Sequence, residues 1–181
     1  EWTTMSAAAN IADEQVQLDA AATLFQPRYT LNGSFKLDER PIDIISKMQA
    51  AGAGELVYVQ GAYRLYAGAY DSPTVELTPS DAAGPIKVNT KPALSDLFNA
   101  VKGTYVTADQ NYAVNEFPAV TDLDAEAADG EQIWQEVEFP FTIDGIAAQR
   151  LATITLRRAR APITVTIPMR YASIRLCVWE M

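Results

Sequence analysis

Most side chains of this chain that are suited to acid–base chemistry are carboxylates, with lysine and tyrosine as the other candidates. The 181 residues include no histidine, which removes the commonest general base and the commonest metal ligand. Ten Asp or Glu and no Lys or Arg lie between Thr104 and Gln149, whereas the rest of the chain is close to neutral, for a net charge of −9. A block of this sign repels nucleic acid and anionic membranes. The composition therefore argues against an enzyme and against a conventional DNA-binding protein.

Five acidic residues of this block alternate loosely, in the manner of a calcium-binding loop: Asp122, Asp124, Glu126, Asp129 and Glu131. They lack the EF-hand pattern, with its central glycine and final bidentate glutamate. A hydrolase built on them would need two carboxylates at a defined separation, one with a raised pKa, and the stretch is too open and polar for that. We expect a solvated loop bounded by Gly130, without a metal.

Aromatic, basic and thiol side chains offer binding chemistry, but each group has a simpler structural explanation. Four tyrosines form a candidate sugar-stacking patch, although tyrosine is common on β-hairpins: Tyr58, Tyr63, Tyr66 and Tyr70. Three arginines crowd the end of a predicted helix, where cations complement the helix dipole: Arg157, Arg158 and Arg160. Cys177, the single cysteine, is expected to be a small buried side chain. The sequence therefore provides no catalytic, cofactor-binding or metal-binding residue.

Residues 28–90 are predicted to form a small α+β cassette of strand, helix and hairpin. The helix is expected to be capped by Asp38, to carry Pro41 in its first turn and to end at Gly52 or Gly54 in a left-handed conformation. Its apolar residues recur at helical spacing: Ile42, Ile45 and Met48 or Gln49. The strand-like runs are 29–31, 34–37, 55–60 and 63–66, the last two joined by a Gly61-Ala62 turn of type II′.

Residues 91–181 are predicted to be rich in strands, with one amphipathic helix near 144–161. Phe98 to Val120 alternates as a strand, passes through turn residues and continues in extended form. The other predicted strands are 132–141, 163–167 and 174–179. Asp144 is expected to cap the helix, which would bury Ala147, Leu151 and Ile154.

Four further features concern the organisation of the chain. Residues 1–27 are expected to be an extended arm or linker, and prolines spaced through 71–98, with short strands at 74–78 and 86–90, mark a soft domain boundary. No apolar run reaches the length of a membrane span. The chain starts on Glu and stops inside an apolar, strand-like run, so we expect a piece of a longer polypeptide, truncated at the C-terminus.

Four blocks of the sequence are RYTLNG (28–33) with PIDIISKM, AYRLYAGAY (62–70), DLFNAVKGTYV (96–106) with NEFPAV (115–120), and QIWQEVEFPFTIDGIAAQRLATITLRRAR (132–160) running into ITVTIP (163–168). Taken together and in order, these blocks resemble the central part of the lambda-type phage tail-tip host-specificity proteins, within the putative phage tail proteins. Order and spacing agree from residue 28 onward. The family members are much longer, and their receptor-binding part lies beyond the residues present here. Ser173 to Met181 also lacks the family's Pro-Gly-Asp-like turn.

The resemblance implies a β-rich, barrel-like hub domain, similar to the baseplate hub of contractile phages and assembled as a homotrimer in the virion tail tip. It implies no enzymatic activity and no cofactor. The expected partners are other tail-tip and distal tail proteins, the tape measure protein, and phage DNA that passes without specific binding; no membrane insertion is expected. Assembly would take place in the bacterial host cytoplasm. The acidic block would either line the DNA passage or face outward, and glycan binding by the tyrosines is the alternative function.

Overall fold

The computed structural model describes residues 15–17, 25–59, 61–69, 76–90, 97–161 and 163–170. Its contacts divide the chain into two compact units, a larger one of residues 1–69 and 98–159 and a smaller one of residues 70–97 and 160–181. Helices and short, mostly antiparallel sheets coexist in the described part, which confirms the mixed α+β class. No described helix is long and apolar enough to cross a membrane.

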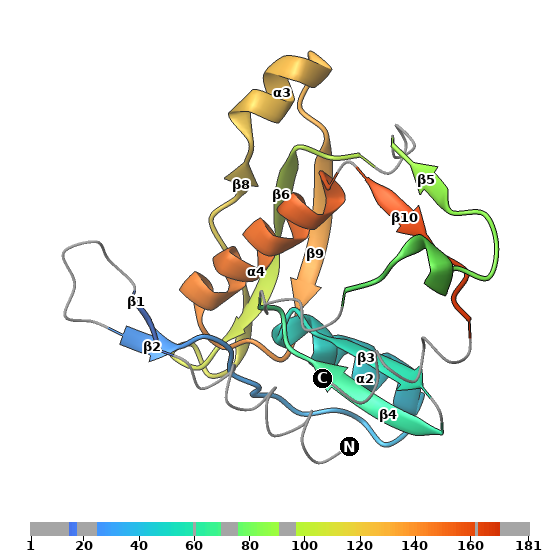
Figure 1. Ribbon diagram of the computed structural model, residues 1–181. Coiled ribbons are helices and arrows are strands. Elements are labelled where there is room, and N and C mark those ends of the chain that lie inside the picture. Colours follow the sequence, from blue (N-terminus) through green and yellow to red (C-terminus); the bar gives the residue numbers. More distant parts are fainter. Residues whose placement is uncertain are drawn as a thin grey trace. The chain divides into compact units, whose positions relative to one another are not determined.

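Figure 1 shows the order of the elements along the chain. The larger unit contains β1 (Gln15–Gln17), β2 (Phe25–Pro27), α2 (Pro41–Ala51), β3 (Glu55–Val59), β4 (Ala62–Tyr66), β6 (Ala100–Thr107), β7 (Ala113–Glu116), β8 (Val120–Thr121), α3 (Leu123–Asp129), β9 (Trp134–Phe139) and α4 (Gly145–Ala159). The smaller unit contains the 3-10 helix η1 (Pro79–Asp81) and strands β5 (Lys87–Asn89) and β10 (Thr164–Thr166).

Strand β6 is the centre of the main sheet. On one edge it pairs antiparallel with β7 and then with β8, and on the other edge it pairs parallel with β9. Pro118, between β7 and β8, has no N–H to give to the ladder, while the neighbouring Phe117 N–H still donates to the Gly103 carbonyl at 3.2 Å. The strands predicted within 98–120 and 132–141 are confirmed. Within the described residues this sheet is open and does not close into a barrel.

Helix α4 covers one face of this sheet and supplies much of the core (Figure 1). Asp144 caps the helix as predicted, because its carboxylate accepts a hydrogen bond from the Ala147 N–H at 3.0 Å. Leu151 and the neighbouring alanines are buried against Val101, Phe117 and Phe139. Burying a side chain such as that of Leu151 contributes about 1.5–3 kcal/mol. The predicted apolar stripe of this helix is confirmed, with Ile154 partly buried beside the cluster.

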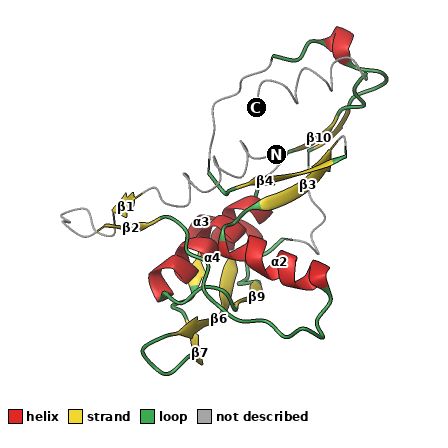
Figure 2. Ribbon diagram, turned by 90° about the horizontal axis from the view of Figure 1, so that it is seen from below, coloured by secondary structure: helices red, strands yellow, loops and turns green. Residues whose placement is uncertain are grey.

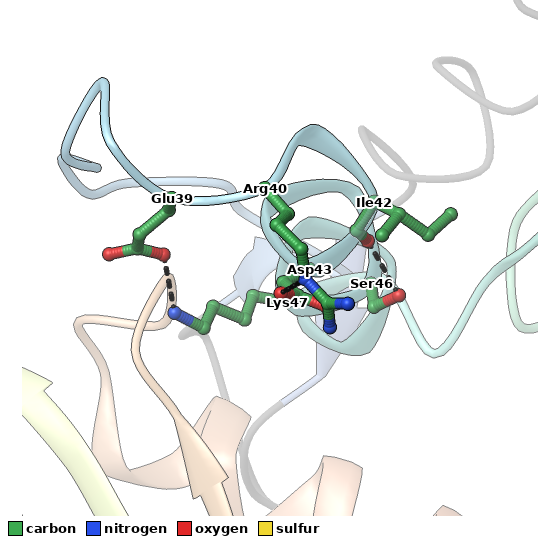
Figure 3. Close-up of polar contacts among 6 residues, drawn as sticks. All are labelled: Glu39, Arg40, Ile42, Asp43, Ser46 and Lys47. Atoms are coloured by element: carbon green, nitrogen blue, oxygen red, sulfur yellow. Dashed lines mark hydrogen bonds and ion pairs between the residues drawn. The ribbon is translucent and has the colours of Figure 1, made fainter.

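Helix α2 packs beside α4 (Figure 2) and starts at Pro41 as predicted, but Asp38 does not cap it. The cap position is Arg40, held in the extended conformation that a residue before proline prefers, and no side chain caps the helix. The first turn is instead tied by an ion pair between Arg40 and Asp43 at 2.8 Å (Figure 3). A second pair joins Lys47 to Glu39 at 2.7 Å.

The end of α2 and the turn of the hairpin also differ in detail from the prediction. The left-handed residue after the helix is Ala53, with φ of 46°, rather than either neighbouring glycine. Its carbonyl accepts a hydrogen bond from Arg158 of α4 at 2.7 Å, which stabilises this unfavourable conformation. Strands β3 and β4 form the predicted hairpin, but Val59 pairs with Ala62, so Gly61 is the second residue of the loop rather than the first.

Segments 29–31 and 34–37 were predicted as strands, but residues 29–36 have no regular secondary structure. Single contacts anchor this segment instead of a ladder. The Asn32 N–H donates to the Phe141 carbonyl at 2.9 Å, and the buried Tyr29 donates its hydroxyl to the Gly68 carbonyl.

The grouping of the two units differs from the consecutive segments 1–27, 28–90 and 91–181 expected from the sequence. Tyr29 and Ala53 belong to the same hydrophobic cluster as Val101 and Leu151, so the cassette shares a core with β6 and α4. The switches between units, after residues 69 and 97, fall at the two ends of the proline-spaced segment.

In the smaller unit, β5 and β10 pair antiparallel with Val88 opposite Val165. The aliphatic residues of the two strands share one face of the ribbon and are exposed within the described chain: Ile86, Val88, Ile163, Val165 and Ile167. The strand predicted at 163–167 is therefore present but not half-buried. Part of the predicted strand 74–78 lacks regular structure at residues 76–78, and the strand predicted at 174–179, together with Cys177 and Tyr70, lies outside the described residues.

Candidate functional site

The face of the main sheet opposite the core carries the most varied chemistry of the larger unit. The side chains of β9 alternate as the sequence predicts, with Val137 and Phe139 toward the core and Trp134 and Glu136 exposed. In the parallel register Lys102 of β6 is the partner of Glu136. Charged and aromatic groups of two strands therefore meet on one exposed face.

These side chains line a depression that we call the sheet hollow, with a volume of about 450 Å³. Its lining residues come from β6, β9 and the end of β7 with the residues that follow: Lys102, Gly103, Thr104, Glu116, Phe117, Ala119, Trp134, Glu136, Val137 and Glu138. Gly103 allows the close approach of β6 and β9, because a Cβ at this position would lie 1.8 Å from the Val137 carbonyl oxygen.

An ion pair fixes the middle of the sheet hollow. The Lys102 ammonium lies 2.8 Å from the Glu136 carboxylate and 5.9 Å from the centre of the Trp134 ring. The hydrogen bond from Lys102 lowers the pKa of Glu136, and the same bond raises the pKa of Lys102. Both groups are solvent-exposed, so the pair orients side chains rather than contributing much stability.

A second depression, the apolar hollow, lies between α2 and the β3–β4 hairpin and has a volume of about 190 Å³. Its lining includes the following residues: Tyr29, Ile45, Met48, Gln49, Gly52, Gly54, Leu56, Leu65, Tyr66 and Ala67. It offers hydrophobic contact and little hydrogen bonding, so its chemistry suits an apolar side chain rather than a polar ligand. Ile42 and Ile45, predicted as part of the helix stripe, remain exposed beside it.

The acidic residues around 122–131 do not form the expected loop, because residues 123–129 are helix α3. Asp122 caps this helix by accepting from the Ala125 N–H at 3.1 Å, and Gly130 ends it with φ of 80°. The helix distributes the carboxylates around its surface. Within the described part of the chain, no three His, Cys, Asp or Glu side chains are grouped so as to hold a metal ion.

Sequence reasoning missed Asn99, which is the best-bonded polar residue of the core. It is only 1% exposed, and its amide nitrogen donates to the Asp129 carboxylate at 2.9 Å and to the Glu131 carbonyl at 2.7 Å. Its amide oxygen accepts from the Ile133 N–H at 2.7 Å. These bonds connect the end of α3 to the starts of β6 and β9. The only sequence signal is a polar residue between the apolar pairs Leu-Phe and Ala-Val.

The tyrosines of the predicted patch that the structure describes do not form one site, because Tyr66 lines the apolar hollow and Tyr58 and Tyr63 do not. Tyr58 and Tyr63 are cross-strand partners on the hairpin with ring centres 4.9 Å apart, and both are exposed. Cross-strand packing accounts for this pair, and neither ring lines the two hollows described above. Among the three arginines predicted at the end of α4, Arg158 donates a hydrogen bond to the Ala53 carbonyl.

A scan against protein-family models and a search of curated proteins found no match for this chain. The assignment of a function therefore rests on the residues, their geometry and the sequence resemblance to phage tail-tip proteins.

Proposed function

We propose that this chain is a structural part of a bacteriophage or prophage tail tip, a hub segment that links the tail tube to the receptor-binding apparatus. In this role it would take part in host attachment and DNA delivery without catalysing a reaction. Its support is the resemblance of four sequence blocks to tail-tip proteins, together with the contacts that these blocks make with one another.

The observation that carries the proposal is that the parts of the four blocks that lie in the larger unit are hydrogen-bonded to one another, whereas ITVTIP lies in the smaller unit. The first block contacts the second through the bond from the Tyr29 hydroxyl to the Gly68 carbonyl. Two hydrogen bonds join the first block to the fourth. The Asn32 N–H donates to the Phe141 carbonyl, and the Arg28 carbonyl accepts from the Arg150 guanidinium at 2.8 Å. The third and fourth blocks contain β6 and β9, which pair over six residues of each strand. A resemblance that covers mutually bonded parts of one unit is what a shared domain would produce.

In a hub, the working interactions would be backbone pairing and apolar burial between subunits. The open sheet and the exposed aliphatic face of the β5–β10 ribbon are surfaces suited to such contacts. We propose a homotrimer, in which strands of neighbouring copies complete a barrel-like hub. Other tail-tip and distal tail proteins and the tape measure protein are the further partners.

The acidic residues of α3 have two possible places in such an assembly. We propose the outer face, where exposed carboxylates keep a particle soluble. In the DNA passage the same carboxylates would repel phosphates and let the duplex slide. A map of the assembled tail tip decides between them by the radius at which five residues lie: Asp122, Asp124, Glu126, Asp129 and Glu131.

Two measurements test the proposal. Reading frames next to the coding sequence should encode a tape measure protein and minor tail proteins. An antibody fragment against the chain should label purified particles at the tail end opposite the head, with particles from a deletion strain as control. Labelling of the head, or absence of the chain from particles, would refute the tail-tip role. Light scattering of the purified chain tests the trimer separately, and a monomer at all concentrations would contradict it.

A further inference from the structure

The sheet hollow combines a flat aromatic surface with hydrogen-bonding groups that the described protein does not use. Trp134 is 43% exposed, although its neighbours on the same face are charged. A large aromatic side chain that is left this exposed on a polar sheet face offers its indole as a surface for stacking. Lys102 lies near the outer limit of cation–π range from this ring, and Glu136 fixes its position.

The other end of the hollow carries two carboxylates with free acceptor capacity. In the strand register Thr104 is opposite Glu116 on one side and Glu138 on the other. Neither carboxylate forms a hydrogen bond or an ion pair with the part of the chain that the structure describes. Each has only a weak electrostatic effect on a lysine, Glu116 on Lys102 and Glu138 on Lys47. Ionised carboxylates are acceptors able to bind two hydroxyl or amine protons at once.

The dimensions set the size of a ligand. Trp134 and Glu138 are four residues apart on one strand, a distance of about 13 Å at the usual rise of a strand. The volume of about 450 Å³ is within the range of small-molecule sites. A ligand that contacts both ends must therefore be elongated, with an apolar face for the indole and several hydroxyl or amine groups for the carboxylates.

We propose that the sheet hollow binds a short oligosaccharide that is neutral or carries an amine. A sugar ring has the required character, because its C–H face stacks on an indole while its hydroxyl groups donate to carboxylates. Three carboxylates and one lysine give the hollow a net negative charge, which disfavours uronic and sialic acids. This inference goes beyond the structural role in a tail tip, and the purified chain is sufficient to test it.

The test is a titration of the ¹⁵N-labelled chain with three disaccharides: cellobiose, the dimer of glucosamine, and the dimer of galacturonic acid. The Trp134 indole resonance is assigned by its loss in Trp134→Phe. We expect cellobiose and the glucosamine dimer to shift this resonance and the galacturonate dimer to leave it unchanged. Backbone amide resonances of the strands that line the hollow report binding by variants that lack the indole. Measured in this way, Trp134→Ala should weaken binding about tenfold or more, the equivalent of the stacking energy. Glu138→Gln should weaken the binding of the glucosamine dimer more than the binding of cellobiose.

Tyr63→Ala is the matched control, because it removes an exposed aromatic ring outside the hollow. It should leave all affinities unchanged. The proposal is refuted if none of the disaccharides shifts the Trp134 resonance at millimolar concentration, or if the galacturonate dimer binds as tightly as the others. Loss of binding in Tyr63→Ala but not in Trp134→Ala would transfer the site to the hairpin tyrosines and also refute it. Because Glu138 is exposed, Glu138→Gln gives an independent reading if Trp134→Ala fails to fold.

Discussion

The bonds of Asn99 allow a prediction in which shape is conserved and only hydrogen bonding changes. In Asn99→Asp the side chain keeps its size, and the oxygen that accepts from the Ile133 N–H is retained. The amide donor to the Asp129 carboxylate and to the Glu131 carbonyl is lost. A bond to a charged group is worth about 1.5–3 kcal/mol and a neutral bond about 0.5–1.5 kcal/mol, so we expect a loss of about 2–5 kcal/mol.

The sign of the pH dependence follows from the same contacts. At neutral pH the new carboxylate faces the Asp129 carboxylate inside a buried site, which adds repulsion. At mildly acidic pH the introduced group is protonated and is again a donor, so part of the lost stability should return as the pH falls. Urea unfolding followed by circular dichroism, at neutral and at mildly acidic pH, measures the loss in the free energy of unfolding and its change with pH.

Asn115→Asp is the control for this substitution. The Asn115 amide also donates to a side chain, that of Gln110 at 3.0 Å, but the bond is exposed. We expect its free energy of unfolding to change by less than about 0.5 kcal/mol. Equal losses in the two variants, or a loss in Asn99→Asp that does not depend on pH, would show that the hydrogen bonds of Asn99 do not hold α3 to the sheet.

Three further substitutions test other parts of the larger unit. Gly103→Ala should separate β6 from β9 and unfold the protein or cost several kcal/mol, because the new Cβ would lie 1.8 Å from the Val137 carbonyl oxygen. The control Gly61→Ala, in open space, should cost about 1–2 kcal/mol for its positive φ. Similar melting temperatures of the two variants would contradict the close packing of β6 and β9. Leu151→Ala should lower the free energy of unfolding, measured by chemical denaturation, by about 2–5 kcal/mol. Ile146→Ala, on the exposed side of the same helix, should change it little. The reverse order would mean that α4 buries its other face. Burial raises the pKa of Tyr29 above the ordinary value of 10.0, so the stability that the buried phenol contributes is complete below pH 10.0 and is lost as the pH rises through the higher folded-state pKa. Tyr29→Phe should remove this part of the alkaline loss of stability, and an identical alkaline unfolding profile would argue against the burial of this phenol.

The elements with strong local patterns could be predicted from the sequence. Alternation located β6 and β9, and a capping aspartate followed by an apolar stripe located α4. Helix α3 was missed because acidic composition suggested a loop, although Asp122 and Gly130 are ordinary start and stop signals. Its short length gave these signals little weight.

The sheet hollow could not be predicted, because it depends on a pairing that no local pattern specifies. Lys102 and Glu136 become neighbours only through the parallel register of β6 and β9, which are separated by a hairpin and a helix. The left-handed conformation of Ala53 has the same kind of origin. It is stabilised by Arg158, and a reader of the sequence would have assigned that conformation to one of the adjacent glycines.

The long-range bonds of α4 also determine when this protein is able to fold. Arg150 reaches back 122 residues to Arg28, and Arg158 reaches back 105 residues to Ala53. Contacts between residues so far apart in the sequence form slowly, because closing the long intervening loop costs entropy before the contacts stabilise the fold. During synthesis, the apolar sides of α2 and the β3–β4 hairpin therefore have no core to join until α4 has left the ribosome. For that interval the N-terminal half is exposed to aggregation, and the emergence of α4 is the step that ends the exposure.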